Sequence, residues 1–184
     1  MQKIHFREAV LQDVDLIMKM EVEGFAPGNR ERKEVYEQRI DVFPQGSLMA
    51  YVGSECVGCI FSEIWHYAPK PAVEYFALGH DISSRHDSVS GTELYVTSMT
   101  IAPPYRGLGL GAQLLSGCVR YVAQRFSQVT TVLLLVNETW GHARDIYVAA
   151  GFKEVVIFKN FFRPVEWCCE DGIVMRRSLS GFPE

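Results

Sequence analysis

The sequence predicts an α/β fold in which strands and helices alternate along one chain. Its 184 residues, 48% hydrophobic and 22% charged, are typical of one soluble domain of ordinary size. Apolar residues switch between a period of two and a period of about 3.6, as strands and helices require. Segment 130–136 is almost wholly apolar, as expected of a strand buried on both faces. Without an internal repeat or linker, we expect a single domain over residues 1–184.

The amino-terminal half is expected to contain three strands and two helices. Asp13 is expected to cap the first helix, and a Pro and Gly cluster at 26–29 ends it. In chain order these elements are a strand at 4–9, helices at 14–23 and 31–42, and strands at 48–52 and 57–65. The segment that follows, 66–92, is rich in Pro, Gly and Ser, and a connection this long is typical of a lid or substrate loop.

The carboxy-terminal half is expected to contain four strands and two helices. A β-branched, apolar strand at 94–101 precedes a glycine-rich segment, and an amphipathic helix follows from about 112 to 126. The apolar strand at 130–136 comes next, then a short helix at 141–150 that Gly151 ends. Two strands, at 152–162 and 172–179, complete the order.

Composition excludes several classes of protein. A formal net charge of −4 argues against a dedicated nucleic-acid binder. No run of ~18 apolar residues is present, which argues against a membrane-spanning protein. The five cysteines do not pair evenly and no secretion signal precedes them, so reduced thiols and a cytoplasmic location are expected. Cys56 and Cys59 lie in an apolar stretch without a second ligand pair, so no metal site is expected.

The strongest chemical signal is the segment Arg106-Gly-Leu-Gly-Leu-Gly111 between a strand and a helix. Closely spaced glycines let successive N–H groups point into one cavity, and the helix adds its positive end, so phosphate binding is expected. A Walker loop is excluded because no Gly-Lys-Ser/Thr occurs. Gly107, Gly109 and Ala112 formally meet the dinucleotide fingerprint, but Pro103-Pro-Tyr-Arg intervenes and the ribose-binding acid is missing. A turn shaped by glycines alone is the remaining alternative.

Arg106-x-x-Gly109-x-Gly111, preceded by Ile101-Ala-Pro-Pro-Tyr, resembles the Arg/Gln-x-x-Gly-x-Gly/Ala loop of the GNAT acyltransferases. Downstream, Ala143-Arg-Asp-Ile-Tyr-Val-Ala-Ala-Gly-Phe152 is similar to that family's Ala-x-x-hydrophobic-Tyr-x-x-x-Gly-Phe segment. Trp140 stands where the family often has Asn. The resemblance covers essentially the whole chain, and the layout is similar to the arylalkylamine-type N-acetyltransferases. It implies the GNAT acyl-CoA N-acyltransferase fold, with a mixed central sheet of about seven strands flanked by about four helices.

The resemblance also implies acetyl-CoA as cosubstrate and a set of residues that bind it. The backbone of the strand before the loop is expected to hold the pantetheine arm, with the Met99 N–H as oxyanion donor. The loop is expected to bind the pyrophosphate. The residues expected to contact acetyl-CoA are Met99, Thr100, Ile101, Arg106, Gly107, Leu108, Gly109, Leu110, Gly111 and Ala112.

For catalysis, Tyr147 is the candidate general acid, since a phenol with a pKa of ~10 is protonated at neutral pH. Glu93 is the nearest candidate base, acting directly or through a water molecule. His80 and His86 are rivals, and proton transfer to bulk-connected water is a further alternative. Phe25, Tyr95 and Thr97 are expected to contact the acceptor; the last two stand where arylalkylamine enzymes have paired histidines.

The predicted function is direct transfer of an acetyl group from acetyl-CoA to a primary amine of a small molecule. An acetyltransferase for a protein N-terminus or lysine and a non-catalytic acyl-CoA-binding module are the alternatives. Residues 1–92 hold 9 Lys and Arg against 14 Asp and Glu, a net of −5, which favours a cationic acceptor. The acidic side chains expected near the acceptor are Glu21, Glu23, Glu34 and Glu37. A homodimer is possible in this family.

Overall fold

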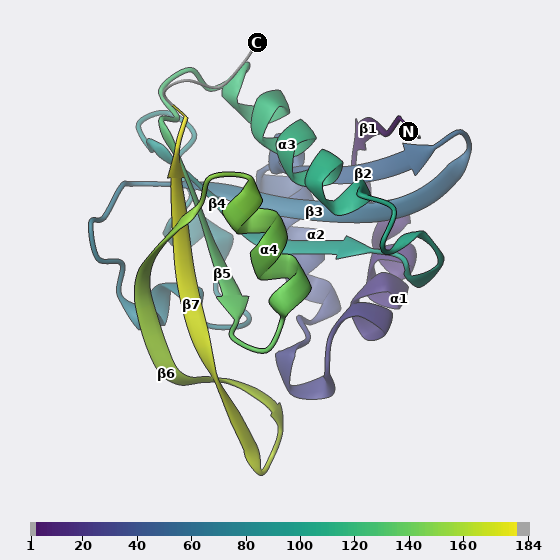
Figure 1. The fold of residues 1–184 in the computed structure, drawn as a ribbon. Coiled ribbons are helices and arrows are strands. Elements are labelled where there is room, and N and C mark those ends of the chain that lie inside the picture. Colours follow the sequence, from purple (N-terminus) through teal and green to yellow (C-terminus); the bar gives the residue numbers. More distant parts are fainter. Residues whose placement is uncertain (1–2, 180–184) are drawn as a thin grey trace.

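A computed structural model describes residues 3–179. The central element is a seven-stranded mixed sheet in the order β1-β2-β3-β4-β5-β7-β6, flanked by four α-helices (Figure 1). Its strands are β1 (His5–Glu8), β2 (Ser47–Val52), β3 (Glu55–Trp65), β4 (Glu93–Ile101), β5 (Thr131–Asn137), β6 (Lys153–Val165) and β7 (Cys168–Ser178). Its helices are α1 (Val14–Gly24), α2 (Lys33–Val42), α3 (Leu110–Ala123) and α4 (Gly141–Ala149). The strand and helix order predicted from the sequence is confirmed.

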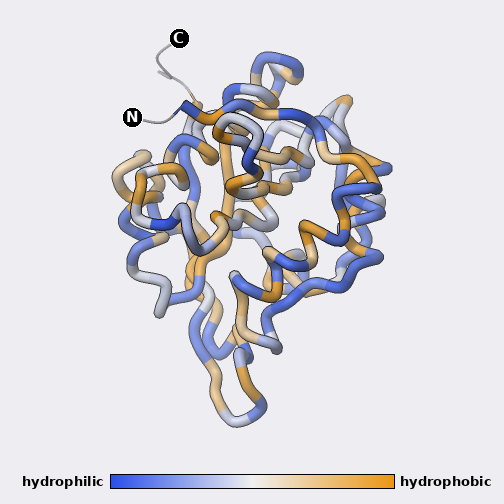
Figure 2. The backbone as a smooth tube through the Cα atoms, turned by 90° about the vertical axis from the view of Figure 1, so that its right-hand side faces the viewer, coloured by the Kyte–Doolittle hydropathy of each residue, from blue (hydrophilic) through white to orange (hydrophobic). Residues whose placement is uncertain are grey.

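Apolar side chains point to both faces of the sheet, and helices cover each face. Met49, Cys59 and Phe61 pack against α1 and α2 on one face. Leu48, Ile60 and other neighbours pack against α3 and α4 on the other. The two helix pairs accordingly lie on opposite sides of the sheet in Figure 1. Figure 2 shows the central strands as mainly hydrophobic, whereas the helices alternate between hydrophobic and hydrophilic residues, as a half-buried helix requires.

Some local predictions need correction. Asp13 occupies the N-cap position of α1, as expected, but its side chain makes no capping hydrogen bond to the helix. Its carboxylate instead accepts hydrogen bonds from the Val10 N–H and from Arg7. Strands β6 and β7 are longer than expected and form a hairpin that projects beyond the sheet (Figure 1). Segment 66–92 is not a plain loop: it contains two short 3₁₀ turns and buries Phe76 and Ile82.

Candidate active site

The sheet opens between β4 and β5. These strands are parallel and pair only from Glu93 to Val96, opposite Thr131 to Leu134. On its other edge, β4 stays paired with β3 up to Ile101, and a bulge leaves Thr97 as an extra residue. Within residues 3–179, residues 97–101 therefore have no β5 neighbour, so backbone groups on that edge, apart from the Ile101 carbonyl oxygen that Arg106 contacts, are available to bind a ligand.

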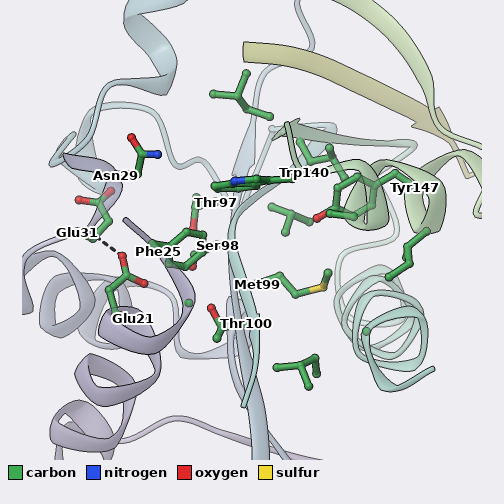
Figure 3. A pocket seen from close by; sticks show the side chains of 18 of the residues that line it. Glu21, Phe25, Asn29, Glu31, Thr97, Ser98, Met99, Thr100, Trp140 and Tyr147 are labelled. Atoms are coloured by element: carbon green, nitrogen blue, oxygen red, sulfur yellow. Dashed lines mark hydrogen bonds between the residues drawn. The ribbon is translucent and has the colours of Figure 1, made fainter. Parts of the chain in front are cut away.

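A cavity of about 340 Å³ lies at this opening. In Figure 3, Met99 and Tyr147 lie on the side of α3 and α4, whereas Glu21, Phe25, Asn29 and Glu31 lie on the side of α1 and α2. Strand β4 runs between the two groups. The cavity thus has two sides that meet at the unpaired part of β4.

The glycine loop forms one wall of the cavity. Arg106, Gly107, Gly109 and Gly111 line it. Gly107 and Gly109 adopt φ values of +76° and +74°, and a Cβ built on either would have no atom within 4 Å, which leaves room for a phosphate group. Gly109 is also the N-cap of α3, so the positive end of that helix faces the same space.

Of the other six residues expected to contact acetyl-CoA, three line the cavity and three do not. Met99, Thr100 and Ile101 line the cavity. Leu108 is exposed and Leu110 is buried in the core, and neither they nor Ala112 line the cavity. The Arg106 guanidinium donates to the carbonyl oxygens of Ile101, at 2.9 Å, and Glu23, at 3.2 Å. This side chain therefore ties the loop to the ends of β4 and α1.

Substitution of Gly109 by Ala is expected to weaken acetyl-CoA binding about tenfold, which is about 1.4 kcal/mol, because a methyl group would enter the space beside the loop. The positive φ adds about 1 kcal/mol of backbone strain. Gly53→Ala is the matched control, since Gly53 also has a positive φ (+60°) and an open Cβ position but lies outside the cavity lining. Both variants should lose similar stability in urea, and only Gly109→Ala should change the acetyl-CoA Kd by calorimetry. Equal Kd values would contradict a phosphate-binding role.

Tyr147 lies on α4, lines the cavity and is only 8% exposed. Its hydroxyl points toward the middle of the cavity in Figure 3 and has no hydrogen-bond partner among residues 3–179. Burial raises the pKa of Tyr147 to about 12. A protonated phenol without a protein partner is thus available to a ligand at the opening of the sheet.

Glu93 lies elsewhere. Its carboxylate is buried at the other end of β4, where Arg176 Nε donates at 2.6 Å and the Thr131 hydroxyl at 3.0 Å. It does not line the cavity. The structure does not bring this candidate base to Tyr147.

The two histidine rivals also have protein partners. His80 lines the cavity, but Nδ1 faces the carbonyl oxygen of Ala77 at 3.1 Å and Nε2 faces Glu63 at 2.9 Å. Neither nitrogen is free to take a proton from an amine. His86 Nδ1 accepts a hydrogen bond from the Ile64 N–H, and burial lowers the pKa of His86. His86 does not line the cavity.

Three aromatic side chains meet at one side of the cavity. Trp140, at the start of α4, lies with its ring centroid 5.5 Å from those of both Phe25 and Phe162. Of the predicted acceptor residues, Phe25, Tyr95 and Thr97 all line the cavity. The Thr97 hydroxyl donates to the carbonyl oxygen of Phe61.

Of the four glutamates expected near the acceptor, Glu21 lines the cavity, whereas Glu23, Glu34 and Glu37 do not. Glu31 also lines it and accepts hydrogen bonds from the Gly79 N–H and from Arg39. Sequence reasoning did not single out Glu31, Arg39 or Glu63, because their contacts join segments far apart in the chain.

Comparison with known proteins identifies the class. Residues 14–152 match the model of the acetyltransferase (GNAT) family. Since this match spans more than half of the chain, the protein belongs to the GNAT acetyltransferases and is an acyltransferase by family. The GNAT fold predicted from the sequence is thereby confirmed.

Individual relatives are distant. The chain is 25% identical over 109 residues to an uncharacterized N-acetyltransferase, YkwB, of Bacillus subtilis (strain 168). This match covers 56% of the chain and 48% of that relative, so the chain spans about half the relative's length.

Solved structures show the same fold. The loading GNATL domain of CurA from Lyngbya majuscula aligns with a TM-score of 0.80 at 16% identity, covering 97% of this chain and 98% of that one. Arabidopsis thaliana Naa50, solved in complex with the bisubstrate analogue CoA-Ac-MVNAL, aligns with a TM-score of 0.69 at 19% identity, covering 96% and 99%. Over residues 3–179, no helix combines the length and apolar character needed to cross a membrane.

Proposed function

We propose that this protein transfers the acetyl group of acetyl-CoA directly to a primary amine of a small molecule. The observation that carries the proposal is the Tyr147 hydroxyl, which faces the cavity beside the unpaired part of β4 and has no hydrogen-bond partner in the described part of the chain. This is where direct transfer needs a proton donor for the departing thiolate.

Bound acetyl-CoA would supply an activated thioester carbonyl. The residues suit that donor, because Arg106 and the glycines of the loop line the cavity beside the start of α3, where a pyrophosphate would bind. The unpaired stretch containing Met99 and Ile101 offers backbone groups for the pantetheine arm. We assign the Met99 N–H as the donor to the carbonyl oxygen, which gains negative charge during attack. Tyr147 then protonates the sulfur.

A small acceptor is favoured over a peptide because the acceptor side is closed. The short turn Pro27–Asn29 after α1 contacts β6 so closely that a Cβ on Gly28 would lie 1.8 Å from the carbonyl oxygen of Arg163. The Phe25, Trp140 and Phe162 rings close the same side. A peptide would need an open groove there, whereas an amine with an aromatic or alkyl body fits between the rings.

The test is release of CoA from acetyl-CoA, with the product identified by mass spectrometry. The panel contains 2-phenylethylamine, alkylamines and short peptides with free N-termini or lysines. We expect turnover with small amines. Turnover with peptides alone would support the protein acetyltransferase alternative, and acetyl-CoA binding without any turnover would support a sensor module.

A further inference from the structure

Glu21 is a buried carboxylate in the wall of the cavity. It lies near the end of α1 and is 3% exposed. Oε1 accepts a hydrogen bond from the Glu31 N–H at 2.8 Å, drawn in Figure 3, and Oε2 accepts one from the Tyr36 hydroxyl at 2.7 Å. These two bonds fix the carboxylate, and each oxygen retains a lone pair for a ligand.

Its charge is not neutralised by an ion pair. Glu31 and Glu63 both pair with Arg39, at 3.2 Å and 3.4 Å, and Glu63 also pairs with His80. Within residues 3–179, Glu21 has no ion-pair partner within 4 Å. Because an isolated buried charge is costly, this carboxylate is suited to a cationic group from a ligand.

Glu21 is also coupled to the strand where transfer would occur. The Tyr36 hydroxyl that donates to Glu21 lies 3.4 Å from the Ser98 hydroxyl, next to Met99 in β4. Gly24, one turn along α1, lies against Thr100, since a Cβ there would be 3.1 Å from the Thr100 methyl group. The carboxylate is thus held beside the unpaired part of β4.

We propose that Glu21 binds the amino group of the acceptor and takes its proton. This inference rests on the proposed function. The ammonium ion gives one proton to the Glu21 carboxylate, and the neutral nitrogen forms a bond to the acetyl carbonyl carbon. When the C–S bond breaks, Tyr147 gives its proton to the departing thiolate, and the second nitrogen proton passes through water to the Tyr147 phenolate and restores the phenol. The amide keeps the third proton, and Glu21 returns its own to water.

The groups around Glu21 suit this role. Burial raises the pKa of Glu21 above its ordinary value, although the hydrogen bonds from Tyr36 and the Glu31 N–H act in the opposite direction. The charge of Glu31 raises the same pKa and that of Arg39 lowers it. Cys59 of β3 faces Glu21 as a neutral thiol, since burial raises the pKa of Cys59. A carboxyl with a raised pKa is a better proton acceptor than an ordinary glutamate.

The decisive variant is Glu21→Gln, measured with acetyl-CoA and 2-phenylethylamine. We expect kcat/KM to fall about 100-fold, with the acetyl-CoA Kd unchanged. Glu34→Gln, an exposed change of the same kind on α2, is the matched control and should behave as wild type. In Tyr36→Phe the carboxylate loses a hydrogen bond that lowers its pKa. The acidic limb of the kcat/KM profile should therefore move to higher pH, which a merely structural role would not produce. Wild-type kcat/KM in Glu21→Gln would overturn the inference.

Binding separates this inference from the proposed function. With CoA bound, wild type should bind 2-phenylethylamine more tightly than uncharged 2-phenylethanol, and Glu21→Gln should lose that preference. If no amine is acetylated, the proposed function fails, and the binding comparison still decides on Glu21. Equal binding of amine and alcohol by wild type would then overturn the role of Glu21.

Discussion

Replacement of Tyr147 by Phe is expected to lower kcat about 100-fold while leaving the acetyl-CoA Kd unchanged, because the ring is kept and the proton donor is lost. Tyr147 suits this test because its hydroxyl has no hydrogen-bond partner within residues 3–179. The change therefore breaks no internal hydrogen bond, and a fall in kcat reports the loss of the acid rather than damage to the fold. Steady-state kinetics and calorimetry measure the two quantities.

The matched control is Tyr121→Phe on α3. The Tyr121 hydroxyl donates to Glu8 at 2.7 Å and Tyr121 lies outside the cavity lining, so kcat should stay at its wild-type value. Since the pKa of Tyr147 is about 12, deprotonation of this phenol should not limit the rate below pH 10. An unchanged kcat in Tyr147→Phe would remove Tyr147 as the acid.

Replacement of Glu63 by Ala is expected to reduce the free energy of unfolding by about 3–5 kcal/mol, because it removes one of the two carboxylates that pair with the buried Arg39 and the carboxylate that pairs with His80. The Glu63 carboxylate is fully buried, lies 3.4 Å from Arg39 Nε and 2.9 Å from His80 Nε2, and accepts a hydrogen bond from the Trp65 indole. Urea unfolding followed by circular dichroism measures the loss. Glu55→Ala, at the exposed start of the same strand, is the control and should change stability by less than about 0.5 kcal/mol.

The effect of Glu63 should depend on pH. Burial alone raises the pKa of Glu63, but the hydrogen bond from His80 and the charges of His80 and Arg39 outweigh it, so the pKa lies below its ordinary value of 4.5. A lowered pKa in the folded state stabilises the protein above pH 4.5, and this contribution is lost as the pH falls toward the folded-state pKa. The stability difference between wild type and Glu63→Ala should shrink below about pH 4.5. A constant difference would contradict an ionised Glu63.

Local patterns were sufficient for much of the fold and for one side of the site. The periodicity of apolar residues predicted the strands and helices. The Arg106 loop and the segment containing Tyr147, recognised by their spacing along the chain, both line one cavity. Both features lie within continuous motifs. Their positions follow from short-range geometry. In a glycine loop that precedes a helix, the backbone N–H groups of the loop lie beside the N-terminus of that helix, so the two together form one anion-binding site.

The other side of the cavity depends on contacts that sequence spacing does not reveal. Glu93 is close to Tyr95 in sequence, but a strand rises about 3.3 Å per residue. Glu93 therefore lies at the end of β4 that pairs with β5, well away from Met99 in the unpaired part of the strand. Its partner, Arg176, comes from β7, which joins the sheet beside β5. Arg39 likewise joins Glu31 and Glu63 across two elements. Such pairs are set by tertiary packing.

The parts of the chain before and after residue 102 contribute different elements to the cavity. Strands β1 to β4 and helices α1 and α2 come from the chain before residue 102, and β5 to β7 with α3 and α4 come from the chain after it. The short parallel junction of β4 and β5 joins these two blocks. Glu21 and Phe25 belong to the first block, and the glycine loop and Tyr147 to the second. Substitutions in and just after α1 can therefore reshape one side of the cavity without changing any residue of the glycine loop or Tyr147.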